Sequence, residues 1–339
     1  MYRILAVLTG TFLLLATLVP GGQAQEIQLS YANFPPAGTF PSVQMERWAQ
    51  EVQERTKDKV HIDTFPGGAL LGAKNMLRGV VQGQADIGCL SMAYQPGVFP
   101  LTSVLELPLG LTSAEQASQV LWELYQEHQP EEFAEVKVLT MFTSAPSNIM
   151  SKKPVRSLKD IKGMELRASG AASRMLKELG ATPVSMPMPE TPEALQKGVV
   201  QGLLSSLEVL KDLDFATYCP YVTMTKLQVY PFAVVMNKDK WESLPSDVQQ
   251  VMLDLAREQA VWTGRYMDRH VQKALKYARD EHQVQVFELG PEEQETVQEK
   301  TRPVIQDWKD RAREDGLDAE GILEDVQRLQ DEYARAGQE

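Results

Sequence analysis

The pattern of apolar and polar positions predicts a strand–helix–strand–helix–strand unit in the first part of the chain. Apolar and polar residues alternate in the predicted strands, and the first helix carries Val43, Trp48 and Val52 at helical spacing. The predicted elements are a strand over 26–34, a helix over 42–56, a strand over 59–65, a turn and helix over 66–83, and a strand over 85–92. This order is typical of a parallel sheet with helices on its faces.

The middle of the chain repeats this order. After a strand over 137–144, the pattern predicts a short helix within 157–163, a strand over 164–170, a helix over 171–180, a strand over 181–187, a helix over 191–202 and a strand or loop over 203–210. The pentamer GVVQG stands at 79–83 and again at 198–202. We expect both copies to end a helix and turn into a strand at equivalent points of two lobes.

The later segments predict connections between the lobes. Residues 221–237 are β-rich and long enough to cross from one lobe to the other, with Pro231 marking a bend. Residues 243–283 predict one long helix with Ser246 as its cap, followed by a strand over 283–289 and a charged helical tail. Since no low-complexity linker separates the lobes, several crossings would form a hinge.

We therefore predict an α/β fold of two lobes, each a β-sheet flanked by helices, joined by crossing strands and a long helix. Lobe I is expected to contain residues 25–142 with about 231–275. Lobe II is expected to contain residues 143–230 with about 276–310, and residues 311–339 are expected to form a C-terminal helical segment.

The first 24 residues have the features of a signal peptide. Arg3 precedes an apolar run over 4–19, and Gly22 and Ala24 supply the small residues at −3 and −1 of a cleavage site. An uncleaved membrane anchor is the alternative, but the run is short for a span and contains several threonines. We expect export, cleavage after about Ala24 and a mature chain of about 315 residues.

Charge and cysteine content narrow the classes of partner. The formal net charge is −12, or −13 without Arg3, and no basic cluster is present, which argues against nucleic acid and anionic lipid as partners. The two cysteines, Cys89 and Cys219, lie in apolar local surroundings. Export would permit a disulfide, but we expect both to be buried free thiols.

No catalytic motif stands out. The four histidines, His61, His128, His270 and His282, form no metal-ligand pattern and are interpreted as surface or strand-face residues. The Gly-rich stretch 66–72 lacks the Lys and Ser/Thr of a phosphate loop. We therefore expect no cofactor, no metal and no enzymatic activity.

Arg167 is the strongest candidate for a binding residue. It ends the strand MELR, immediately before the small residues ASGAAS and a helix. Ligands of parallel sheets bind outside the carboxyl ends of strands, where a following helix offers free N–H groups. An arginine adds a two-pronged donor that matches a carboxylate.

Three ordered blocks of sequence resemble the DctP-type solute-binding proteins of tripartite ATP-independent periplasmic (TRAP) transporters. They are TFPGGALLGAKNMLRGVVQGQADIG, then PVRSLKDIKGMELRASGAASRMLKELGATPVSMPMPETPEALQKGVVQG, then VVMNKDKWESLPSDVQQVM. The resemblance covers nearly the whole mature chain. It implies a periplasmic-binding-protein-like fold with a cleft between the lobes, capture of a small organic acid in the periplasm, and delivery to a membrane permease.

In that family, the arginine at the position of Arg167 binds the ligand carboxylate with two hydrogen bonds. The resemblance places eight further residues at the cleft: Asn33, Phe34, Ser91, Tyr94, Ser147, Asn148, Met188 and Ser205. We expect the protein to work as a monomer.

Departures from the family pattern bear on the ligand. Sialic-acid-binding members have a second arginine near Ser147, an acidic group near Ser91 and an asparagine near Ser205, and Gln201 replaces a common aspartate. A polyhydroxylated sugar acid is therefore disfavoured. Tyr94, Met188 and Phe34 favour a monocarboxylate with a partly apolar body.

Two alternatives remain at this stage. One is a periplasmic ligand-sensing module that serves a receptor or sensor kinase. The other is an exported lyase or hydrolase, which would need a titratable pair near Arg167, where the sequence offers only Glu165 and Glu208. Glu165 shares the strand face of Arg167, which is more simply interpreted as an ion pair.

Overall fold

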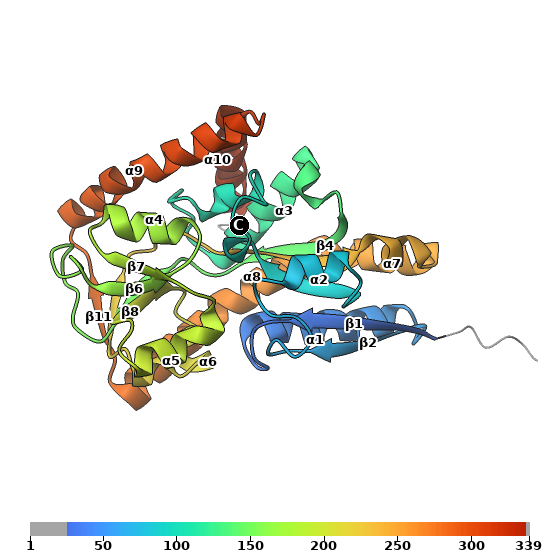
Figure 1. Ribbon diagram of the computed structural model, residues 1–339, viewed down its shortest axis with the longest axis horizontal. Coiled ribbons are helices and arrows are strands. Elements are labelled where there is room, and N and C mark those ends of the chain that lie inside the picture. The colour runs from blue at the N-terminus through green and yellow to red at the C-terminus, as the bar shows by residue number, and fades with distance from the viewer. Residues whose placement is uncertain (1–25, 337–339) are drawn as a thin grey trace, which may run out of the picture.

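The computed structural model describes residues 26–336, which form two β-sheets with helices packed around them (Figure 1). The predicted signal peptide lies outside the described residues. Within residues 26–336, no helix has an apolar stretch that is long enough to cross a membrane.

The first sheet has five strands in the order β2-β1-β3-β10-β4. Strands β1, β2 and β3 are parallel, and β10 is antiparallel to both of its neighbours. The strands are β1 (Ile27–Asn33), β2 (Val60–Phe65), β3 (Ile87–Ser91), β4 (Val136–Thr143) and β10 (Pro231–Asn237). The helices of this lobe include α1 (Phe40–Arg55), α2 (Met76–Val81), α3 (Ala114–His128) and α7 (Lys238–Ser243), with 3-10 turns η1 (Met92–Tyr94), η2 (Thr102–Glu106) and η3 (Glu131–Phe133).

The second sheet has six strands in the order β11-β9-β5-β8-β6-β7. The strands are β5 (Asn148–Ser151), β6 (Glu165–Ala168), β7 (Thr182–Ser185), β8 (Gly202–Ser205), β9 (Tyr221–Met224) and β11 (Gln285–Glu288). Its helices include α4 (Ala171–Glu178), α5 (Thr191–Gln196) and α6 (Val209–Asp212), with 3-10 turns η4 (Met188–Glu190) and η5 (Phe215–Thr217). Along the order β7-β6-β8-β5-β9 the strand directions are those of β2-β1-β3-β10-β4, although the chain connects the strands differently in the two lobes. The predicted fold of two α/β lobes is confirmed.

The two GVVQG segments are not structurally equivalent, so this part of the sequence interpretation is wrong. In the first copy the letters GVV complete α2, and Gly83 lies just beyond it at φ 70°. In the second copy α5 has already ended, and Gly198 occupies that position at φ 73°. Each of these glycines donates to the carbonyl three residues earlier. The requirement for a left-handed residue is therefore shared, but the pentamer is shifted relative to it.

Two extended segments cross between the lobes side by side. One joins β4 to β5 and the other, residues 225–230, joins β9 to β10. Tyr230 N donates to Ser144 Oγ at 2.9 Å, and Ser147 N donates to the Gln228 carbonyl at 2.8 Å. The predicted single strand over 221–237 is therefore two strands, because the chain leaves one sheet at 224 and enters the other at Pro231.

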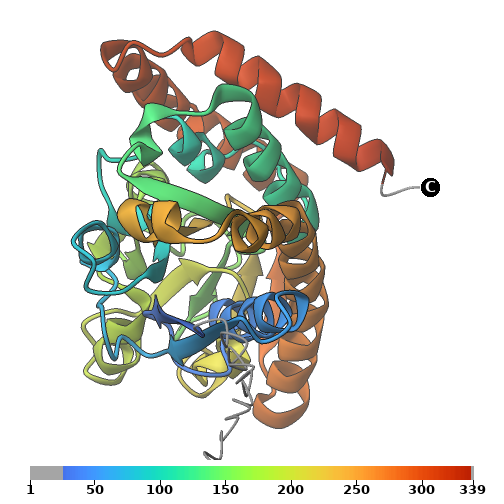
Figure 2. The ribbon, with the colours of Figure 1, turned by 90° about the vertical axis from the view of Figure 1, so that its right-hand side faces the viewer.

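The helix α8 (Ser246–His282) provides a third connection. It packs on α1, α3 and β4 of the first lobe and on α6 of the second (Figure 2). Ser246 does not cap it, contrary to the prediction, because the chain is already helical there. Pro245 holds the cap position, and its carbonyl accepts from Val248 N and Gln249 N.

Two helices near the C-terminus lie along one side of both lobes. Helix α9 (Pro291–Glu314) packs on α4 of the second lobe, and α10 (Ala319–Ala336) packs on α3 of the first (Figure 1). Cys89 lies in the core of the first lobe and Cys219 in that of the second, and both are free thiols, as expected.

Candidate ligand-binding site

A cleft with an empty volume of about 620 Å³ lies between the lobes beside the two crossing segments. The first lobe and the crossing segments contribute Phe34, Pro35, Pro36, Thr39, Phe40, Pro41, Ser91, Tyr94, Ser144, Tyr230 and Phe232. The second lobe contributes Arg167, Met188, Pro189, Ser205, Ser206, Glu208, Val209, Asp212 and Leu213. The cleft is therefore built from segments that are far apart in the sequence.

Arg167 is fixed in this cleft by the protein itself. It is only 1% exposed, on β6. Its Nε and Nη2 donate to the Met186 carbonyl at 3.0 and 2.7 Å, and Nη2 also reaches Tyr94 Oη at 3.0 Å. Among the described residues, Nη1 has no hydrogen-bond acceptor. One edge of the guanidinium thus orients the group, and the other nitrogen keeps two N–H donors for a ligand.

Two expectations about the surroundings of Arg167 are not met. The first N–H of α4, that of Ala171, already donates to Glu106 Oε2 at 2.8 Å, so this group is not free for a ligand. Glu165 forms no ion pair with Arg167 within residues 26–336, and only its backbone, whose carbonyl accepts from Gln201 N at 2.8 Å, is hydrogen-bonded there. The charge of Arg167 therefore has no carboxylate partner within the described part of the protein.

Six of the nine predicted site residues line the cleft: Phe34, Ser91, Tyr94, Arg167, Met188 and Ser205. The other three do not. Asn33, the last residue of β1, is buried, with Nδ2 directed to Ser42 Oγ at 3.4 Å. Ser147 and Asn148 bind the second crossing segment, since Asn148 Oδ1 accepts from Thr225 N and Lys226 N. These residues hold the crossing segments together.

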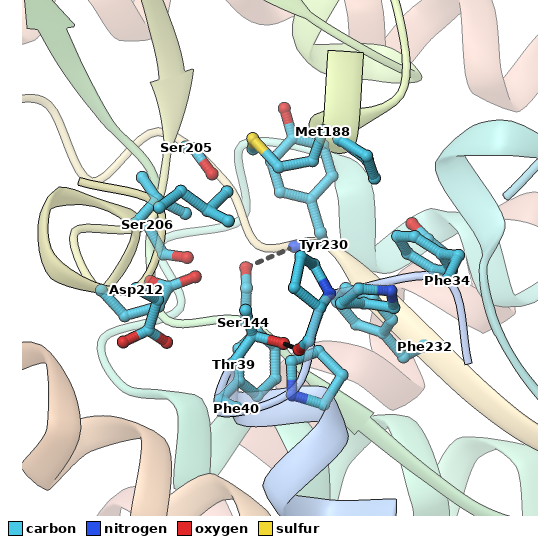
Figure 3. Close-up of a pocket in the computed structure, with 18 of the residues that line it drawn as sticks. Phe34, Thr39, Phe40, Ser144, Met188, Ser205, Ser206, Asp212, Tyr230 and Phe232 are labelled. Atoms are coloured by element: carbon cyan, nitrogen blue, oxygen red, sulfur yellow. Dashed lines mark hydrogen bonds between the residues drawn. The ribbon is translucent and has the colours of Figure 1, made fainter. Parts of the chain in front are cut away.

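One wall of the cleft is aromatic, and most of its side chains were not predicted to be site residues. Phe232 stacks on Phe34, with ring centroids 6.5 Å apart, and meets Phe40 edge-on at 5.6 Å. Figure 3 shows Phe34 and Phe232 on one side of the cleft and Ser205, Ser206 and Asp212 on the other. Phe40 and Phe232 look like core residues of a helix and a strand, so the sequence gives no signal that they reach the cleft.

Glu208 and Asp212 were not predicted as cleft residues either. Burial, with the nearby Asp212 carboxylate adding to it, raises the pKa of Glu208 to about 8. Asp212 Oδ1 lies 2.7 Å from His270 Nε2, and both side chains are largely buried. His270 is therefore not a surface residue, because α8 carries it against α6.

One group within residues 26–336 has a spacing that could hold a metal ion, namely Glu127, His128 and Asp325. Arg328 donates to both Glu127 and Asp325, and His128 Nε2 lies 3.0 Å from Asp325 Oδ2. The carboxylates are thus already compensated, and the group is interpreted as a surface ion-pair network.

The fold and the cleft define a two-lobe solute-binding protein. Residues 31–311 match the model of the bacterial extracellular solute-binding proteins of family 7, DctP, and the chain belongs to this family.

Solved structures agree with this assignment. A TRAP periplasmic solute-binding protein from Desulfovibrio salexigens is 60% identical, with a TM-score of 0.83 over 91% of this chain and 97% of that chain. A marine metagenome TRAP protein specific for aromatic acid ligands, solved with 3-hydroxybenzoate, is 28% identical, with a TM-score of 0.87 over 91% and 99% of the two chains. A Bordetella bronchiseptica TRAP protein with bound (R)- and (S)-mandelate is 25% identical, with a TM-score of 0.85 over 91% and 99%.

Proposed function

We propose that this protein captures a small organic acid in the periplasm and delivers it to a TRAP-type membrane permease. The observation that carries the proposal is Arg167, a buried guanidinium in the interlobe cleft with an uncommitted nitrogen and no carboxylate partner among the described residues. A carboxylate would supply the missing charge and two acceptors.

The solved relatives support a carboxylate as the anchored group. The ligand-binding site of the 60% identical Desulfovibrio protein held the C-terminus of a symmetry mate in an open complex. A polypeptide C-terminus is a carboxylate. The site of that protein therefore accepted the kind of group that we propose Arg167 binds here.

We further propose that the ligand is a monocarboxylate with a ring-sized apolar body. Arg167 is the only lysine or arginine among the residues that line the cleft in the described part of the chain, so a second carboxylate would lack a cationic partner. Phe34, Phe40 and Phe232 offer aromatic surface for such a body. Two of the relatives bind acids of this kind.

In this proposal the chain acts as a monomer whose two lobes close on the ligand. Residues 25–142 with about 231–275 form one body, residues 143–230 with about 276–310 form the other, and the paired crossing segments bend. Ligand binding favours the closed form only through contacts that the open form lacks. Tyr94, which reaches Arg167 from the other lobe, is placed to offer a ligand carboxylate such a contact.

A thermal-shift screen of the mature protein tests the function. We expect benzoate, 3-hydroxybenzoate or mandelate to raise Tm, and succinate or gluconate to have little effect. A ligand at 100 times its Kd adds about 2.7 kcal/mol to stability, equivalent to several degrees. The shift should persist in Arg302→Ala, an exposed arginine outside the cleft, and vanish in Arg167→Ala. A panel of acids without any shift would contradict the proposal, once mass spectrometry excludes a co-purified ligand.

A further inference from the structure

Three residues of the second lobe form a polar corner within the same cleft. We call Ser206, Glu208 and Asp212 the acidic corner; they follow β8 and continue into α6. Ser206 is 1% exposed, Glu208 4%, and the Asp212 side chain 5%. Glu208 Oε2 and Asp212 Oδ2 are buried without a hydrogen-bond partner among the described residues, and the buried Ser206 hydroxyl is close enough to the Glu208 carboxyl to lower its pKa.

Such atoms are costly to leave without a partner. A buried polar group without a hydrogen bond loses its hydration and gains nothing in return, so nearly all such groups in native proteins are satisfied. Here two such carboxyl oxygens lie within residues 206–212 and border one cleft, where Figure 3 shows Ser206 and Asp212 close together. The acidic corner therefore has unused hydrogen-bonding capacity that a bound molecule can fill.

The charge state of the acidic corner restricts the group that fits. Asp212 is already paired with His270 through Oδ1, which leaves Oδ2 as an acceptor. Burial raises the pKa of Glu208 to about 8, so at neutral pH this residue mostly keeps its proton and can donate. The corner thus offers both an acceptor and a donor. A hydroxyl group can satisfy both at once, whereas an ammonium can only donate.

We propose that the acidic corner binds a hydroxyl group of the ligand, so that the protein takes a hydroxylated, ring-sized carboxylic acid. The inference rests on the proposed function, because Arg167 holds the carboxylate of the same molecule. The aromatic wall contacts the ring between these groups. Glu208 and Asp212 are then specificity-determining residues, since they distinguish a hydroxylated acid from the unsubstituted one.

The test compares ligands that differ by one group. Calorimetry measures binding of benzoate, 3-hydroxybenzoate, 4-hydroxybenzoate and 3-(aminomethyl)benzoate to the wild type. We expect one hydroxybenzoate to bind about tenfold more tightly than benzoate, since a hydrogen bond to a buried polar group contributes on this scale. Glu208→Met keeps the volume but removes the hydrogen bonds, and should reduce this ratio to about threefold or less.

Two further variants keep the inference testable if Glu208→Met does not fold. Glu208→Gln retains a donor and an acceptor and should preserve most of the hydroxyl preference. Ser206→Ala should reduce it in part. Asp214→Asn, at a neighbouring side chain that is 62% exposed, is the matched control and should leave the ratio unchanged.

The outcomes separate this inference from the proposed function. If benzoate binds but the hydroxyl gives no preference, or the preference survives in Glu208→Met, the acidic corner does not bind hydroxyl and only the inference fails. Preferred binding of the aminomethyl compound would overturn it in favour of a cationic ligand group. If none of the four acids binds the wild type, both the inference and the ring-sized acid of the proposed function are wrong.

Discussion

Tyr94 Oη accepts a hydrogen bond from Arg167 Nη2 at 3.0 Å, and this contact joins the two lobes at the ligand cleft. The same oxygen accepts from Met188 N at 3.0 Å. With both acceptor positions occupied, the hydroxyl proton of Tyr94 is free to point to a ligand oxygen. One side chain of the first lobe thus positions the arginine, meets the η4 backbone and offers a donor to the carboxylate.

Tyr94→Phe should therefore weaken acid binding by about three- to tenfold, because it removes a donor and an interlobe contact while keeping the ring. Calorimetry with the acid that gives the largest thermal shift measures the change. Tyr221→Phe, on a strand away from the cleft, serves as the control. An unchanged Kd would mean that Tyr94 contributes only apolar contact.

The contribution of a second interlobe contact to stability should depend on pH. Glu106, on η2 of the first lobe, accepts from Ala171 N at the start of α4, and Arg311 also faces it. Burial raises the pKa of Glu106 to about 7, above its unfolded value near 4.5. The folded state therefore binds the Glu106 proton more tightly than the unfolded state does. The contribution of Glu106 to the free energy of unfolding is greatest below pH 4.5 and is lost as pH rises to about 7.

Glu106→Gln keeps an acceptor for Ala171 N–H but does not titrate. The Tm of this variant relative to the wild type should therefore increase between pH 5 and pH 8, corresponding to a few kcal/mol at most. Thermal unfolding of both proteins at unit pH intervals measures the difference. A constant difference, or one that falls with pH, would contradict the assigned shift.

Close backbone packing at Gly264 supports the long connecting helix. A Cβ at this position of α8 would lie 2.5 Å from Glu115 Cα and 2.7 Å from the Ala114 carbonyl oxygen. Since these are backbone atoms, Gly264→Ala should cost about 1–3 kcal/mol, measured by urea unfolding. Gly290→Ala is the control, because its φ is −63° and nothing lies within 4 Å. Equal stability of both variants would show that α3 and α8 can move apart enough to accept a Cβ at little cost in free energy.

The two thiols should be inert in the folded protein. Burial raises the pKa of the Cys89 thiol above its usual range and that of Cys219 to about 12, so neither forms thiolate near neutral pH. We expect no reaction with a thiol reagent in the native state and two reactive thiols per chain after unfolding. A Tm that falls on addition of reductant would instead indicate a disulfide.

The sequence predicts the fold well because strand and helix periodicities are local properties. It also places Arg167 correctly on a strand, since the position follows from one segment. It fails where the outcome depends on distant partners. Phe40 and Phe232 read as core residues, and His270 reads as a surface residue on α8, because their neighbours come from other lobes or elements. The sequence likewise suggests that the N–H of Ala171 is free, because its acceptor, Glu106, lies 65 residues earlier in the chain.

The most direct test of the account is calorimetry of the identified acid with wild type, Arg167→Ala, Arg167→Lys and the control Arg302→Ala. Loss of the charge-assisted hydrogen bonds from Nη1 in a buried cleft should cost about 2–4 kcal/mol in Arg167→Ala. Arg167→Lys should also bind poorly, because one ammonium cannot reproduce the planar guanidinium, which contacts Met186 and Tyr94 and still presents Nη1 to the ligand. Arg302→Ala should match the wild type. If folded Arg167→Ala bound the acid within twofold of wild type, Arg167 would not be the carboxylate anchor and the central claim would be wrong.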